Sequence, residues 1–189
     1  MFGLVFTRRY SMAHRLIADA GSKCAVPHGH NERVTVRLEA GEARRLDGVR
    51  NMVEPFETAK ARWHRWIDEA VDHAFQLSDR DPLIDYFRDR EPDRLAHLLI
   101  TPGDPSTEML AACFKAKLTA FLEEDGGRLC CVDVRIEETP TNAVTFSGNP
   151  ADFLPEGVAG DNRPAWWQRA DMSINDLFRN TPRPERTRP

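Results

Sequence analysis

The chain has 189 residues, of which 41% are hydrophobic, and a net charge of −4. These values predict one domain with an ordinary core, or one domain with an appendage. The slightly acidic balance excludes a strong electrostatic footprint for nucleic acid, and no apolar run is long enough to cross a membrane. The N-terminus carries no signal-peptide pattern and the four cysteines form no disulfide framework, so a cytoplasmic protein is expected.

The first half of the chain predicts two strands and a helix. Strands are expected over residues 2–17 and, after a loop, over residues 28–40, where apolar and polar residues alternate. A helix is expected from about Pro55, because proline suits the first helical position and apolar residues then recur every three or four. Trp63 and Trp66 of that helix are expected in the core or at an interface.

The next segment predicts an insertion and a second long helix. Residues 78–104 are polar and interrupted by prolines, which favours an insertion with a short helix near residues 83–87. The long helix is expected to begin near Asp104 and Pro105, with Asp104 as its N-cap. The pair Gly126-Gly127 is expected to end it.

Two further strands complete the predicted fold. Val132, Val134 and Ile136 share one face of the first of them, and Glu138 continues that face. The other is expected at about residues 142–147. Four antiparallel strands with two helices on one face form an α+β layer structure.

The C-terminal segment differs in composition from the rest. Residues 149–189 hold six of the thirteen prolines and the pair Trp166-Trp167. We expect a domain over residues 1–148 and an extension that packs locally through its tryptophans and frays at its end.

The strongest chemical signal is a group of metal-ligand residue types near the N-terminus. His28 and His30 are two residues apart on a predicted strand, so both imidazoles point to the same face. With His14 as a third ligand, a tetrahedral zinc would keep one open position, as catalytic zinc sites do. A structural zinc with Cys24 as the fourth ligand is the alternative, and the spacing does not exclude it.

Asp72 and His73 form a second candidate group near the end of the first helix. An aspartate can set the tautomer of a histidine and stabilise its protonated form. Adjacent residues on a helix do not face each other, so this contact requires a bent backbone or another partner.

Six segments in this order resemble one enzyme family: YSMAHRL, CAVPHGHN, NMVEPF, VDHAFQL, PSTEMLA and EETPTNAV. They span about residues 4–147 and resemble the 6-pyruvoyl-tetrahydropterin and 6-carboxy-tetrahydropterin synthases. The short spacing between Cys24 and HGH resembles the bacterial carboxy branch more than the animal pyruvoyl branch. The resemblance implies the tunnelling fold, in which trimers close a barrel, trimers pair into hexamers, and sites lie between subunits.

The resemblance also implies the residue roles in catalysis. The three histidines would bind Zn²⁺, and Cys24 would be the general base. Asp72 and His73 would complete a proton relay and could serve the Cys24 of a neighbouring subunit in the homo-oligomer.

The implied substrate is 7,8-dihydroneopterin triphosphate. Glu138 would accept hydrogen bonds from the pterin ring N–H and amino group, and Ser106 and Thr107 would lie at the same pocket. The carboxy branch releases triphosphate and acetaldehyde and supplies 6-carboxy-5,6,7,8-tetrahydropterin for queuosine and other 7-deazapurines.

Several alternatives remain open at the level of sequence. The pyruvoyl branch uses the same ligands, a diverged paralogue could process another pterin, and a non-enzymatic module could bind zinc or pterin. Lys23, Arg15 and Arg33 are candidates for the triphosphate and equally for ordinary surface charges. Glu32 departs from the family pattern, which commonly has an aromatic or small residue there.

Overall fold

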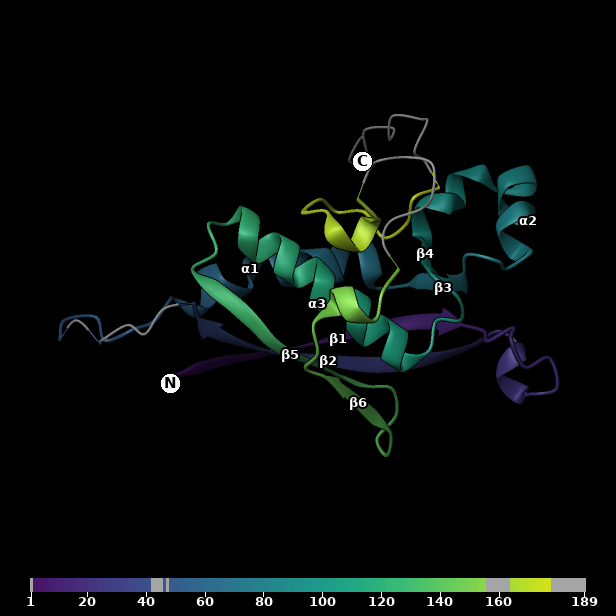
Figure 1. Cartoon of the computed structure of the whole chain (residues 1–189). Coiled ribbons are helices and arrows are strands. Elements are labelled where there is room, and N and C mark those ends of the chain that lie inside the picture. The colour runs from purple at the N-terminus through teal and green to yellow at the C-terminus, as the bar shows by residue number, and fades with distance from the viewer. Residues whose placement is uncertain (1, 42–45, 47, 156–163, 178–189) are drawn as a thin grey trace.

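A computed structural model of the protein describes residues 2–41, 46, 48–155 and 164–177 (Figure 1). It confirms the predicted α+β class, with helices packed on a single sheet. The elements in sequence order are β1 (Gly3–His14), η1 (Lys23–Ala25), β2 (His28–Ala40), α1 (Phe56–Trp66), η2 (Ile67–Val71), β3 (Ala74–Ser78), α2 (Leu83–Arg90), η3 (Pro92–His97), β4 (Leu98–Thr101), α3 (Thr107–Glu124), β5 (Leu129–Glu137), β6 (Ala143–Phe146), η4 (Pro150–Asp152) and η5 (Trp166–Gln168).

The sheet contains the four antiparallel strands that the sequence predicted and two more. Its order is β4-β3-β1-β2-β5-β6, and β1, β2, β5 and β6 pair antiparallel. The expectation of only four strands was wrong, because β3 and β4 extend the sheet beside β1 as parallel strands. Both are short, largely buried runs, and apolar periodicity cannot distinguish such runs from helix or loop.

The core lies between the sheet and the helices α1 and α3, which cover one face of it (Figure 1). Alternate residues of β1 enter this core, among them Tyr10 and Met12. Trp63 and Trp66 are buried as predicted, with ring centroids 5.9 and 5.1 Å from that of Phe114 on α3. These aromatic contacts hold α1 against α3 above the sheet.

Helix α3 begins two residues later than the sequence predicted. Ser106 is its N-cap and accepts a hydrogen bond from the Met109 N–H at 3.3 Å. The Asp104 carboxylate instead accepts from the N–H groups of Ile17 and Ala18, both at 2.9 Å. The prediction of Asp104 as the N-cap was therefore wrong, because its carboxylate oxygens accept hydrogen bonds from the segment after β1 instead.

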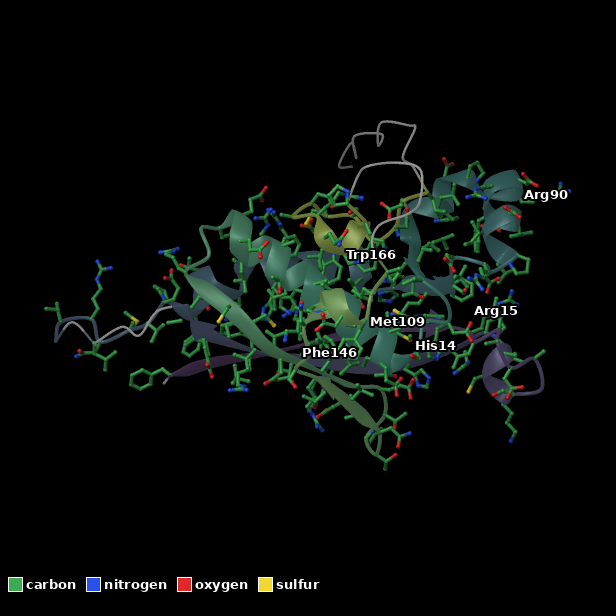
Figure 2. The ribbon with its side chains drawn as sticks, viewed as in Figure 1. His14, Arg15, Arg90, Met109, Phe146 and Trp166 are labelled. Carbon is green, nitrogen blue, oxygen red and sulfur yellow. The ribbon has the colours of Figure 1, made fainter. Side chains whose placement is uncertain are left out.

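The described part of the C-terminal segment packs into the main core. Trp166 is 1% exposed, and its indole N–H donates to the Ile100 carbonyl at 2.7 Å (Figure 2). The Ile100 N–H donates to the Ile174 carbonyl at 3.1 Å, so the segment covers the outer edge of β4. Lys117 of α3 is buried and donates to the Trp166 carbonyl at 3.0 Å and to Asp171 at 3.1 Å.

Further expectations concern the C-terminal segment and the end of α3. The expected fraying lies outside the described residues, and the division into a domain over residues 1–148 and a C-terminal extension stays a prediction. Gly126 and Gly127 end α3 as expected, both with positive φ. Within the described residues, no helix is long and apolar enough to span a membrane.

Candidate functional site

Three histidine side chains converge where β1 ends and β2 begins. The antiparallel register places His14 directly opposite His28, and His30 lies two residues further on the same face. Their candidate ligand nitrogens all lie within 4.8 Å of one another, and the Nε2 atoms of His14 and His28 are 3.1 Å apart. Two nitrogens on one tetrahedral zinc lie about 3.4 Å apart, so the spacing fits a metal ion.

The other ring nitrogens of two histidines are held by backbone carbonyls. Nδ1 of His14 lies 3.2 Å from the Pro105 oxygen, and Nδ1 of His28 lies 2.9 Å from the Val26 oxygen. An N–H that donates to these carbonyls leaves Nε2 with its lone pair, as in metal sites whose ligands are oriented by a second partner. Burial lowers the pKa of His14, although the Pro105 hydrogen bond opposes this shift, and so favours the neutral, metal-binding form.

A glycine between the two strand histidines permits the close pairing. Gly29 is opposite Ala13 in the register. A Cβ atom at Gly29 would lie 2.7 Å from the Met12 carbonyl oxygen, which is closer than side chains approach backbone. Only glycine therefore lets β1 and β2 meet at the point where His14 and His28 face each other.

Cys24 lies apart from the three histidines, in the short turn η1 between β1 and β2. It is half-buried and has a free thiol. Its N–H donates to the Ser22 hydroxyl at 3.1 Å, and its carbonyl accepts from Leu16 at 2.8 Å. In the described part of the protein, the metal-ligand group contains the three histidines without Cys24. This geometry favours three protein ligands and an open position over a closed four-ligand site.

Asp72 and His73 contact each other because the helix ends abruptly before them. Helix α1 runs into the π-helical turn η2, after which His73 adopts a φ of 65°. This bend places the Asp72 carboxylate 3.0 Å from Nδ1 of His73. Ser11 of β1 holds both residues, since its N–H donates to Asp72 and its carbonyl accepts from the His73 N–H, each at 2.7 Å.

The Asp72–His73 pair faces solvent rather than the three histidines. The His73 side chain is 80% exposed. No hydrogen bond or ion pair between the described residues joins this pair to Cys24. The structure therefore assembles the expected pair and does not connect it to the expected base within a single chain.

The start of α3 brings Glu138 beside the three histidines. The Thr107 hydroxyl donates to the Glu138 carboxylate at 3.1 Å, and the charge of Glu138 raises the pKa of His14 against the effect of burial. Ser106 caps the helix through its hydroxyl, whereas Thr107 contacts the acid directly. Since Pro105 contacts His14, one short segment orients both the metal-ligand group and Glu138.

Two buried polar residues beside the histidines were missed as site residues. Glu32 is 1% exposed and accepts a hydrogen bond from the Tyr10 hydroxyl, while its second oxygen is unpartnered. Burial raises the pKa of Glu32 to about 7, and the Glu138 charge adds to this rise. Gln76 is opposite His14 in the β1–β3 register and is buried with both amide atoms unpartnered. The sequence could have indicated Glu32, because it lies four residues after His28 and therefore on the same face of the strand. Gln76 could not be predicted, because β3 was not recognised as a strand.

Two basic residues near the site form ion pairs with acidic side chains. Arg15 follows His14 at the end of β1 (Figure 2) and forms two hydrogen bonds with the buried Asp81. Arg33 lies 3.4 Å from Glu137. Arg15 thus secures the segment after β3, which weakens its case as a triphosphate ligand.

Comparisons with known proteins agree on one family. The model of the 6-pyruvoyl tetrahydropterin synthase family matches residues 4–149. The "Probable 6-carboxy-5,6,7,8-tetrahydropterin synthase" of Halobacterium salinarum is 33% identical over 132 residues, which cover 70% of this protein and 77% of the relative.

The solved structures that resemble this protein share its fold. An uncharacterized protein from Wolinella succinogenes has a TM-score of 0.62 at 20% identity, covering 78% of this protein and 98% of that one. The 6-pyruvoyl tetrahydropterin synthase of Caenorhabditis elegans has a TM-score of 0.52 at 25% identity, covering 78% and 95%.

Proposed function

Because the chain belongs to the 6-pyruvoyl tetrahydropterin synthase family, we propose that it is a zinc-dependent 6-carboxy-5,6,7,8-tetrahydropterin synthase. The proposed substrate is 7,8-dihydroneopterin triphosphate, which takes up one water and releases triphosphate and acetaldehyde in the pathway to queuosine and other 7-deazapurines. The observation that carries the proposal is the group of three histidine nitrogens within 4.8 Å, next to the Thr107–Glu138 pair. The name of the Halobacterium salinarum relative supports the carboxy branch.

The three histidines suit Zn²⁺ in donor type, spacing and protonation. Their neutral imidazoles would hold the ion, with Pro105 and Val26 orienting two of the rings. Zinc bound there supplies a Lewis acid to the hydroxyl oxygens of the substrate.

The residues beside the ligands orient the pterin ring. Glu138 accepts hydrogen bonds from the ring N–H and the amino group, since a carboxylate offers two acceptor oxygens. The Thr107 hydroxyl, 3.1 Å from one of these oxygens, sets the direction of the carboxylate. Ser106 keeps Thr107 in place by capping α3.

Cys24 is the proposed base that removes a carbon-bound proton from the three-carbon substituent of the substrate, acting as a thiolate. The Asp72–His73 pair passes the proton to solvent, and its 80% exposed imidazole is accessible to a second copy of the protein. The proposal therefore includes a homo-oligomer, built from trimers that can pair into a hexamer, in which this pair approaches the Cys24 of a neighbour.

Product analysis by mass spectrometry tests the proposal. Zinc-loaded protein is incubated with 7,8-dihydroneopterin triphosphate, and 6-carboxy-5,6,7,8-tetrahydropterin and acetaldehyde are expected. Unchanged substrate, with zinc confirmed in the protein, would overturn the proposed activity.

The second candidate is 6-pyruvoyl-tetrahydropterin synthase. The likeness to the Caenorhabditis elegans enzyme of that name favours it. This branch keeps the three-carbon substituent, so a pyruvoyl product without acetaldehyde would replace the leading proposal by this one.

A further inference from the structure

The segment between β1 and β2, residues 15–27, carries Cys24 without a hydrophobic anchor of its own. None of its residues is buried, and Val26 is 66% exposed. Burial of apolar side chains is the main force that holds one part of a protein against another. Within a single chain, the position of this segment and of Cys24 therefore depends on hydrogen bonds and ion pairs.

Asp104 holds the start of this segment with both of its carboxylate oxygens. Oδ1 accepts the Ile17 N–H and Oδ2 accepts the Ala18 N–H, each at 2.9 Å. Hydrogen bonds to a carboxylate are roughly twice as strong as those between neutral groups. Two successive N–H groups on one carboxylate fix both the place and the direction of the backbone there. The preceding residue, Arg15, is held separately by Asp81.

Cys24 is bonded to the residue next to this contact. The Leu16 N–H donates to the Cys24 carbonyl at 2.8 Å, so the backbone of Cys24 lies beside the residues that Asp104 holds. Apart from a contact between Val26 and His28, the two bonds to Asp104 are the only hydrogen bonds that join residues 16–26 to the rest of the described chain.

The residues that follow Asp104 contact the other parts of the site. The Pro105 carbonyl oxygen lies 3.2 Å from Nδ1 of His14, and the Thr107 hydroxyl donates to Glu138 at 3.1 Å. Both Pro105 and Thr107 are buried, so this stretch of backbone is well anchored. One short piece of chain thus contacts a candidate metal ligand, the candidate pterin-binding acid and the segment of the proposed base.

We propose that Asp104 is a positioning residue, which fixes Cys24 relative to His14 and Glu138 by holding residues 16–18 against the start of α3. The inference rests on the proposed function, in which Cys24 is the base. Asp104 acts through the backbone and not on the substrate. A base must lie within hydrogen-bond reach of the proton that it removes, and a displacement of about 1 Å can lower the rate about 100-fold.

Steady-state kinetics of zinc-loaded, full-length protein with 7,8-dihydroneopterin triphosphate test the inference. Asp104→Ala removes both acceptor oxygens, and its kcat is expected to fall about 10- to 100-fold. KM and zinc content should stay at the wild-type values, because Glu138 and the three histidines keep their own contacts. Asp104→Asn retains one acceptor oxygen and should lose less activity; it also serves as the test if Asp104→Ala does not fold.

Alkylation of Cys24 by iodoacetamide gives a second readout that does not depend on turnover. Mass spectrometry of the peptide that contains Cys24 distinguishes its modification from that of the other cysteines. The thiol is half-buried in the wild type, and release of its segment should expose it. Alkylation is therefore expected to be faster in Asp104→Ala and Asp104→Asn than in the wild type.

Asp171→Asn is the matched control for a loss of stability alone. Asp171 also accepts a backbone N–H, from Ser173 at 3.0 Å, but it lies in the C-terminal segment and pairs with the buried Lys117. The control variant should melt at a lower temperature than the wild type. Its kcat and its rate of Cys24 alkylation should nevertheless equal those of the wild type when measured below that temperature.

The outcomes separate this inference from the proposed function. A wild type that converts the substrate, together with an unchanged kcat in the folded Asp104 variants, refutes the positioning role alone. A wild type that converts no substrate refutes the proposed function, and the alkylation rates then decide whether Asp104 holds Cys24 in place. Equal alkylation rates in the wild type and the Asp104 variants would refute that role as well.

Discussion

His14 and His28 face each other across the β1–β2 pair, with their Nε2 atoms 3.1 Å apart. Two imidazole nitrogens at this distance share one proton or one metal ion, because both cannot hold a hydrogen between them. The backbone carbonyls behind the rings favour the second arrangement by holding the Nδ1 hydrogens.

Replacement of one ligand should abolish stoichiometric zinc binding. We expect His28→Ala to lose the metal and to lose the rise in melting temperature that zinc produces in the wild type, since a ligand of the folded state stabilises it. Elemental analysis and thermal melts with added zinc check this. His73→Ala, at an exposed imidazole outside the group, should retain both properties; equal zinc content in the two variants would contradict the assignment.

A methyl group at Gly29 should disturb the site through the backbone. Gly29→Ala would place its Cβ 2.7 Å from the Met12 carbonyl, and we expect a loss of about 1–3 kcal/mol in unfolding free energy. Zinc affinity should fall with it, because the β1–β2 pairing positions the ligands. Gly3→Ala is the control on the same strand pair: its Cβ would meet its nearest neighbour at 3.6 Å. Similar denaturation midpoints for both variants would refute the steric argument.

Cys24→Ala should separate catalysis from metal binding. Turnover is expected to fall about 100- to 10,000-fold, which is the usual contribution of a positioned base, while zinc content stays at the wild-type level. Steady-state kinetics and elemental analysis together provide the test. Cys130→Ala, at an exposed thiol, should leave both unchanged. Loss of zinc from Cys24→Ala would instead support a closed four-ligand site.

The buried Lys117 should make stability depend on pH. Burial lowers its pKa from 10.5 to about 8, so between these values the unfolded state binds more protons than the folded one. The contribution of Lys117 to stability therefore rises as pH increases from about 8 to 10.5. Urea titrations should show the wild type gaining about 1–3 kcal/mol relative to Lys117→Met over this interval. A constant difference between the two proteins would show that the lysine is not protonated differently on folding.

The positions that local periodicity controls could be read from the sequence. A strand places alternate residues on one face, so the common direction of His28 and His30 and the inward position of Glu138 followed without a structure. The start of α1 after Pro55 and the end of α3 at Gly126 likewise depend on the conformational limits of proline and glycine. The three-histidine group could be expected because its members lie on strands adjacent in sequence.

Contacts between distant segments were decided only by the tertiary structure. Periodicity did not distinguish β3 and β4 as strands, so Gln76 could not be placed beside His14. Asp104 is a residue type that often caps helices, but its carboxylate accepts hydrogen bonds from the backbone N–H groups of Ile17 and Ala18 instead. The contact between Asp72 and His73 needed the π-helical turn, and the proximity of Glu138 to Glu32 needed the pairing of β2 with β5.

The sequence by itself thus determined which residues share a face and which offer side chains suited to metal binding or acid–base chemistry. Those properties depend on side-chain type and on the repeat of a single strand or helix. Only the tertiary structure decided which faces meet: where the C-terminal tryptophans pack, which carboxylates are already engaged, and which oxygen of Glu32 remains unpartnered. These contacts depend on packing and hydrogen bonding between segments far apart in the sequence. A pattern of residues along the chain does not say how close two such segments lie in space.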